Sequence, residues 1–150
     1  MKFSFTLTGL GWGEATVSDG EQQVVIPASY LTDVLSELLT AVWSVLEGTP
    51  SASCSWELEP GEYRWLFTRI DDQLSLRILA FPNNSWDNGP DEEGVIVFHF
   101  SGTLDAIASA FAEGIEAVRR EYGEEGYLQG WHEHPFPSEQ LSEVTALLCP

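Results

Sequence analysis

The stretch from Cys54 to Pro82 constrains the fold most, because it alternates apolar and polar residues through two turn-like interruptions, Pro60–Gly61 and Asp71–Asp72. Alternation with a period of two predicts strands that bury one face. If Pro60 and Gly61 form a two-residue loop, Trp56 lies opposite Trp65. Both hairpins then agree on one apolar face, which a slip of one residue would reverse. The stretch therefore predicts a three-stranded antiparallel meander whose buried face carries Trp56, Leu58, Tyr63, Trp65, Phe67, Leu74, Leu76, Ile78 and Ala80.

The other face of this meander is mainly polar. The first turn places Glu57 opposite Arg64, a favourable cross-strand pair, while the second turn places Phe67 opposite Leu76 on the buried face. Four apolar side chains share the polar face, which is more than a fully solvated face needs: Leu66, Ile70, Leu79 and Phe81. We therefore keep open a structural role in which the protein self-associates, as a homodimer, through this open sheet face.

Further strands are predicted on both sides of the meander. Short alternating segments indicate strands at residues 2–8, 14–18 and 23–26. The apolar run at residues 95–100, VIVFHF, predicts a strand near the centre of the sheet. Its more buried face is expected to carry Ile96, Phe98 and Phe100. Together with the meander, these segments predict one antiparallel sheet of about six strands.

Apolar residues that recur at helical spacing predict two long helices and a short one. The first carries a wide apolar stripe from Leu31 to Leu46, with Ser29 as its N-cap. The second runs from about Thr103 to Tyr122 and ends at Gly123. An aromatic connector then leads to a short C-terminal helix capped by Ser138. The expected architecture is α+β, with the two long helices packed on one face of the sheet.

Charge is the compositional extreme of the chain, which has 24 Asp and Glu against 6 Lys and Arg and a net charge of −18. Binding a polyphosphate requires cations that replace its counterions, so this charge argues against nucleic acid and anionic membrane as partners. It favours a basic protein partner, because opposite charge speeds the encounter.

The length of 150 residues fits a single domain, 1–150. No apolar run reaches the length of a membrane span, and the N-terminal MKFSFTLTG lacks the apolar block of a signal peptide. We therefore expect a cytoplasmic protein. Cys54 and Cys149 fit two reduced thiols in that compartment, while a disulfide between them stays open.

The histidines suggest an alternative, a metal-binding or hydrolytic domain centred on His99, His132 and His134. His132 and His134 lie two residues apart in an extended segment, so they could share a metal ion, but a zinc site needs further ligands. Structural hydrogen bonding is the simpler role for all three. Because no nucleophile motif of the G-x-S-x-G type accompanies them, we expect no catalytic residues, no metal and no cofactor.

The tail of the chain carries the motif YLQGWHEHPFP at residues 127–137. With the acidic domain, the two amphipathic helices and the antiparallel sheet, this motif resembles the immunity proteins of bacterial toxin systems. The resemblance is carried by Tyr127, Trp131, His134, Pro135, Phe136 and Pro137 and by the general layout. It implies a protein that binds a cognate toxin and blocks its active site, with no catalytic residues of its own.

We therefore expect a non-enzymatic protein-binding module that binds and blocks a basic partner, such as a toxin, through an acidic surface. The loop at residues 82–94 combines a tryptophan with several carboxylates, and tryptophan often anchors protein interfaces. Glutamates on the polar face of the meander extend this acidic surface. The expected partner-binding residues are Trp86, Asp87, Asp91, Glu92, Glu93, Glu57 and Glu59.

Overall fold

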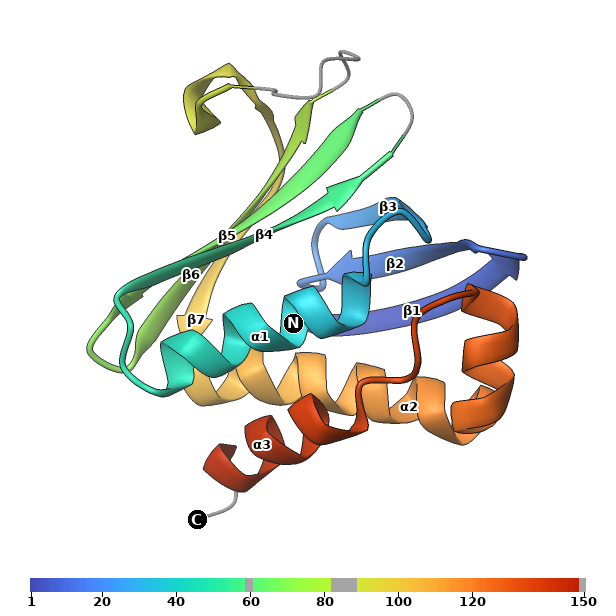
Figure 1. Ribbon diagram of the computed structural model, residues 1–150. Helices are drawn as coiled ribbons and strands as arrows, with labels where there is room; N and C mark the ends of the chain where they lie inside the picture. Colours follow the sequence, from blue (N-terminus) through green and yellow to red (C-terminus); the bar gives the residue numbers. More distant parts are fainter. Residues whose placement is uncertain (59–60, 82–88, 149–150) are drawn as a thin grey trace.

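Two antiparallel sheets form in the computed structural model, which describes residues 1–58, 61–81 and 89–148 (Figure 1). Three strands make one sheet, in the order β1-β2-β3, and four make the other, in the order β4-β5-β6-β7. The α+β class is confirmed, whereas the single sheet of about six strands is wrong. The strands are β1 (Lys2–Gly9), β2 (Trp12–Ser18), β3 (Gln23–Ser29), β4 (Ser51–Glu57), β5 (Glu62–Ile70), β6 (Gln73–Phe81) and β7 (Val95–Thr103).

The strands divide into two sheets because β3 meets the four-stranded sheet only at its ends. The side chain of Gln22 donates to the carbonyl of His99 in β7 at 3.0 Å. The hydroxyl of Ser29 donates to the carbonyl of Glu57 in β4, also at 3.0 Å. β3 therefore reaches from β7 at one end to β4 at the other and pairs with neither of these edge strands. Pro27 in β3 has no N–H to contribute to a second ladder, which is typical of an edge strand.

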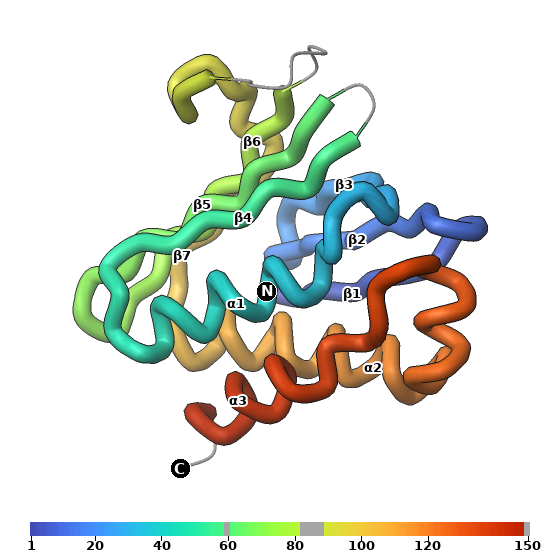
Figure 2. The backbone as a smooth tube through the Cα atoms, viewed as in Figure 1, coloured from blue at the N-terminus to red at the C-terminus, as the bar shows by residue number. Residues whose placement is uncertain are grey.

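The helices lie together below both sheets in the view of Figure 2. α1 packs chiefly on β4 and α2 chiefly on β1, so the two long helices do not share one sheet face as predicted. α3 packs on both of them. Within the described residues, no helix is both long enough and apolar enough to cross a membrane. The helices are α1 (Val34–Leu46), the short 3-10 helix η1 (Asp91–Glu93), α2 (Leu104–Trp131) and α3 (Ser138–Leu148).

The first long helix differs from its predicted start, whereas α3 begins at Ser138 as expected. α1 starts at Val34, because Ser29 belongs to β3 and uses its hydroxyl in the contact with β4. The helical backbone of α2 is interrupted at Gly123, with a φ of 72° and a ψ of 163°, where the sequence predicted the helix to end, but a second helical segment follows in place of the predicted connector. The segment beyond the kink stays helical because it buries Tyr127 and Trp131 in the core.

The second hairpin of the meander is confirmed in every predicted pair. Phe67 lies opposite Leu76 and Trp65 opposite Ile78. Asp71 has a φ of 54°, a left-handed conformation that Asp adopts more readily than most residues. The two-residue turn is therefore sufficient to set this register.

The pairing of the first hairpin is wrong by two residues. Trp56 lies opposite Tyr63, and Cys54 lies opposite Trp65. The N–H of Leu58 donates to the carbonyl of Gly61 at 2.9 Å, which centres the turn one residue earlier than predicted. An even shift leaves each side chain on its predicted face, so both tryptophans are still buried.

A β-bulge near the start of β7 reverses the predicted faces of two residues, Val95 and Ile96. Ile78 lies opposite Phe98, but the next residue, Leu79, lies opposite Ile96, so Val97 is the extra residue. Ile96 therefore joins the polar face and is 55% exposed, whereas Phe98 is buried.

Aromatic rings from both sheets and from α2 fill the core. The rings of Trp56 and Trp65 lie 4.7 Å apart between centroids, and Phe111 of α2 packs against Phe3, Trp65 and Phe67. Cys54 is a free thiol beside them, and burial raises its pKa. Cys149 lies outside the described residues.

Candidate functional site

An ion-pair network centred on Arg64 organises the end of the four-stranded sheet that projects beyond β3. Arg64 in β5 donates from Nε to Glu62 at 3.1 Å and from Nη1 to Asp91 at 2.7 Å. Nη1 also donates to the carbonyl of Gly89 at 3.1 Å. Burial by itself lowers the pKa of Arg64, but the hydrogen bonds and charges of Glu62 and Asp91 raise it above its usual value. A permanently charged guanidinium therefore holds η1 against β5.

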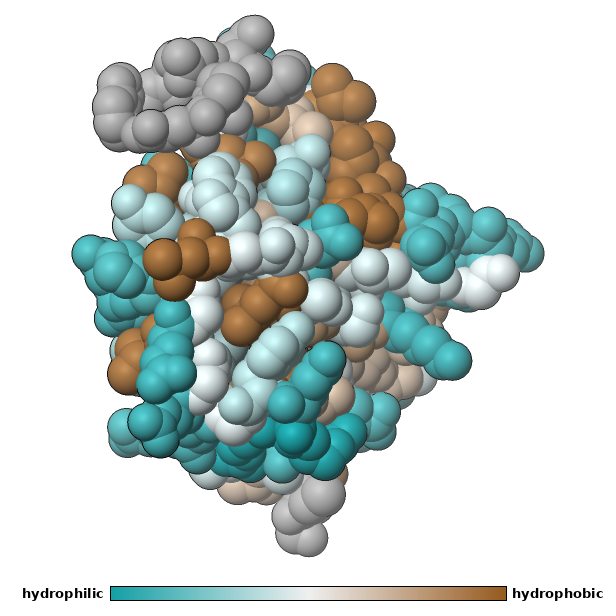
Figure 3. Space-filling model, turned by 90° about the vertical axis from the view of Figure 1, so that its right-hand side faces the viewer, coloured by the Kyte–Doolittle hydropathy of each residue, from teal (hydrophilic) through white to brown (hydrophobic). Residues whose placement is uncertain are grey.

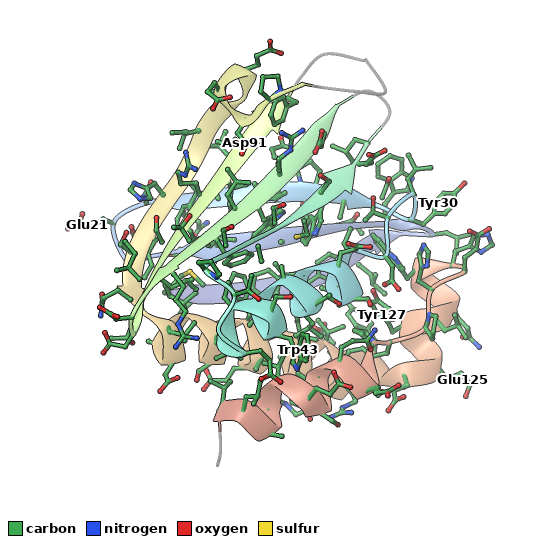
Figure 4. The ribbon with its side chains drawn as sticks, turned by 60° about the vertical axis from the view of Figure 1, so that its left-hand side comes forward. Glu21, Tyr30, Trp43, Asp91, Glu125 and Tyr127 are labelled. Atoms are coloured by element: carbon green, nitrogen blue, oxygen red, sulfur yellow. The ribbon has the colours of Figure 1, made fainter. Side chains whose placement is uncertain are left out.

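Four of the seven predicted partner-binding residues lie in the described part of the chain, and the fold brings them to this end. Asp91 belongs to the network, and Glu92 and Glu93 are exposed on η1. Glu57 is exposed at the end of β4, opposite Glu62. Figure 4 labels Asp91 here, far from Glu125 at the opposite end of the molecule. The other three, Trp86, Asp87 and Glu59, lie outside the described residues.

The predicted pair of Glu57 with Arg64 is wrong, and the sequence missed the actual acidic partner of Arg64. Because the first hairpin is shifted, Ser55 lies opposite Arg64, and its hydroxyl donates to Glu62 at 2.5 Å. Glu62 is 6% exposed. The sequence did contain a signal for the ion pair of Glu62 with Arg64, because residues two apart on a strand lie on the same face of the sheet.

The polar sheet face is more covered than the sequence suggested. Leu66, Leu79 and Phe81 are buried and form a second, small apolar cluster. The guanidinium of Arg64 covers it, 4.3 Å from the centroid of the Phe81 ring. Of the four apolar residues expected on this face, only Ile70 is exposed, at the opposite end of the sheet.

Two apolar side chains are exposed beside the acidic residues. Val95 is 59% exposed and Ile96 55% exposed, and both come directly after η1. They lie on opposite faces of the sheet, because Val95 is opposite Ala80 and Ile96 is opposite Leu79. The projecting end of the sheet thus combines fixed carboxylates with exposed apolar surface.

The histidines occupy two separate places. His99 contacts Ser75 on the polar face, with Nε2 3.3 Å from the hydroxyl. His132 packs edge-on against the ring of Tyr30, and Nε2 of His134 donates to the carbonyl of Tyr30 at 2.9 Å. Among the described residues, no group of three or more His, Cys, Asp or Glu side chains is arranged to hold a metal ion.

A partly buried polar cluster lies where the tail motif meets the start of α1. Nδ1 of His134 is 3.9 Å from Oδ2 of Asp33, and burial raises the pKa of Asp33 although the imidazole opposes this. Oδ1 of Asp33 and the hydroxyl of Tyr127 are buried without a hydrogen-bond partner among the described residues. Burial also raises the pKa of Tyr127. The motif residues therefore contribute to the core.

A groove of about 940 Å³ lies between α2 and α3. Its lining mixes carboxylates with two arginines, of which Arg119 is paired with Glu116 at 2.5 Å and with Glu124 at 3.8 Å. The end of the sheet around Arg64, whose exposed charges are mainly carboxylates, is therefore the better candidate for a binding site. Comparisons with models of protein families, with curated proteins and with solved structures give no match.

Proposed function

We propose that this protein is a non-enzymatic, cytoplasmic binding module of the immunity type, which binds and blocks a basic protein partner such as a toxin. Its binding surface is the projecting end of the four-stranded sheet. The observation that carries the proposal is the acidic group at this end. Glu62 and Asp91 bind the guanidinium of Arg64, and three further carboxylates are exposed on the same strand end or on η1: Glu57, Glu92 and Glu93.

Two physical arguments support this surface. A carboxylate held in place loses little freedom when a partner binds, so the ion pair of Arg64 with Asp91 prepares η1 for binding. Exposed Val95 and Ile96 supply apolar area beside the charges, and protein interfaces combine an apolar centre with a polar rim. The acidic field would steer a basic partner to this end.

The test is a charge reversal on η1, the double variant Glu92→Lys/Glu93→Lys. Proteins encoded by the neighbouring genes are purified, and any basic one is titrated by calorimetry, because immunity genes sit beside their toxins. We expect the reversal to weaken binding by about tenfold or more at low salt and by less at high salt, since exposed charges are screened.

The matched control is Glu121→Lys/Glu125→Lys, which changes the net charge equally but at two exposed positions of α2. This control should change the affinity by about threefold or less, because its charges lie far from the proposed surface. Equal losses in the two variants, or binding that ignores salt, would contradict the proposal.

A further inference from the structure

The outer edge of β3 presents backbone groups with no strand beside them. The N–H of Tyr30 donates to the carbonyl of Gly11 at 2.9 Å, and that of Asp19 donates to the carbonyl of Gln22 at 3.2 Å. Both bonds continue the β2–β3 register and show that even-numbered residues of this strand turn their backbone groups toward β2. The residues that alternate with them turn theirs outward: Gln23, Val25, Pro27 and Ser29.

Pro27 independently supports this assignment, because a residue without an N–H fits an outward position and not a bonded one. The two ends of the outer edge are engaged, by the contacts of Gln22 with His99 and of Ser29 with Glu57. Val25 lies between them. Its N–H and C=O have no hydrogen-bond partner within the described part of the chain, and its side chain is 46% exposed.

An apolar row of the four-stranded sheet lies next to this outer edge. Tyr63, Ala80 and Val95 are cross-strand neighbours on the face that β3 crosses. β3 meets β7 at His99, so Val95, four residues nearer to η1, lies beyond the crossing and stays exposed. Tyr63 and Ala80 are half-buried. Figure 3 shows apolar surface gathered beside the residues drawn in grey.

We propose that β3 accepts an extended segment of the basic partner as an additional strand. The segment would span about five residues, the length from Gln23 to Pro27, and would pair with the outward backbone groups of Val25. Alternate side chains of an added strand point to opposite faces. Apolar ones would rest on the row of Tyr63, Ala80 and Val95, and Lys or Arg would face outward.

Charge complementarity selects this occupant over a second copy of the chain. Two exposed carboxylates lie near this edge, Glu14 in β2 opposite Pro27 and Glu21 in the turn before β3. Two copies, each with a net charge of −18, would bring these carboxylates together. The proposal rests on the proposed function and adds the mode of binding to it.

The test uses a fluorescent seven-residue peptide of alternating lysine and valine, titrated by polarisation. Val25→Pro removes the outward N–H, whereas Val25→Thr keeps it along with a β-branched side chain. We expect Val25→Pro to weaken binding by about tenfold and Val25→Thr by about twofold or less. Equal affinities of both variants and the wild type would overturn strand addition.

A peptide N-methylated at alternate residues, so that one edge lacks its N–H groups, tests the same bonds without altering the protein. We expect it to bind about tenfold more weakly than the parent peptide. Val95→Thr should weaken binding about threefold, whereas Ile70→Thr, at an exposed position at the opposite end of the sheet, should not. Equal binding of a glutamate–valine peptide would refute the charge argument.

Sedimentation of the protein without peptide measures its oligomeric state and so tests the alternative occupant of this edge, a second copy of the chain. A wild-type dimer that Val25→Pro converts to a monomer, with no peptide binding, would assign this edge to a second copy and overturn the proposal. If the charge reversal on η1 weakens binding of the protein partner but Val25→Pro does not, the proposed function stands and strand addition is wrong. If neither variant changes the affinity for the protein partner, both the proposed function and strand addition are wrong.

Discussion

The carboxylates of Glu62 and Asp33 lie in two different environments. Glu62 is buried and accepts hydrogen bonds from Arg64 and Ser55. The side chain of Asp33 is 30% exposed, and the imidazole of His134 lies 3.9 Å from one of its oxygens, while the other oxygen is buried without a partner among the described residues. A buried charge is tolerated when it is paired and hydrogen-bonded, and otherwise favours its neutral form.

The comparison separates a structural role from a proton-sensitive one. The Glu62 site holds η1, and with it the proposed binding surface, through a cation whose pKa is raised further. The Asp33 site has a carboxyl whose pKa is raised by burial, so its protonation changes at milder acidity than that of an exposed aspartate. The first site should therefore respond to mutation and the second to pH.

The largest effect is expected from Arg64→Met, which leaves Glu62 buried without its cation. We expect a loss of about 2–3 kcal/mol in the free energy of unfolding, measured by urea denaturation. The control is Arg77→Met in β6, since Arg77 has no ion pair among the described residues and should lose about 0.5 kcal/mol or less. Similar losses in the two variants would show that the network does not stabilise the fold.

A smaller effect should distinguish two tyrosines of α2. Tyr122→Phe removes the acceptor of the Leu7 N–H, a bond of 3.0 Å, and should cost about 1 kcal/mol. Tyr127→Phe removes a hydroxyl without a partner among the described residues, so stability should stay within about 0.5 kcal/mol or rise. Thermal unfolding of both variants checks this. An equal cost at Tyr127 would mean that its hydroxyl is satisfied after all.

The smallest effect concerns Asp33→Asn, and its sign depends on pH. Because burial raises the pKa of Asp33, the folded state holds this proton more tightly than the unfolded state. Wild-type stability should therefore fall as the pH rises from the ordinary value of 3.8 through the raised value. Asn stays neutral, so the variant should be more stable near neutral pH, by about 1 kcal/mol or less, and lose this advantage in acid.

Urea denaturation between about pH 3 and pH 7 measures this difference. His134, Glu37 and Tyr127 also act on this carboxyl, so His134→Gln serves as a second variant that removes the imidazole. An advantage of Asp33→Asn that grows as the pH falls would contradict the assignment.

Much of the secondary structure could be predicted because it depends on local pattern. The turn at Asp71–Asp72 has two residues between strong alternating segments, so Phe67 could only meet Leu76. The first turn allowed two strand registers that differ by two residues. Both registers place each side chain on the same face, so the alternation of apolar and polar residues cannot distinguish them. Composition alone singled out the acidic loop, whose role in binding stays a prediction, whereas the residue pairs around Arg64 depended on that register.

Other features depended on contacts that no local pattern encodes. Ser29 has the residue type of a helix cap, yet its hydroxyl is taken by Glu57, 28 residues away. The segment after Gly123 has the composition of a connector and is helical because Tyr127 and Trp131 are buried. Nothing in VIVFHF indicates the bulge that moves Ile96 to the polar face.

By itself, the sequence determined the α+β class, the side of each meander residue and the sign of the molecular charge, because these follow from period, composition and short-range turns. Only the tertiary structure decided how the strands divide between two sheets, which carboxylate pairs with Arg64 and which strand edge stays open. These features result from packing between distant segments, where the gain from burial outweighs local preference.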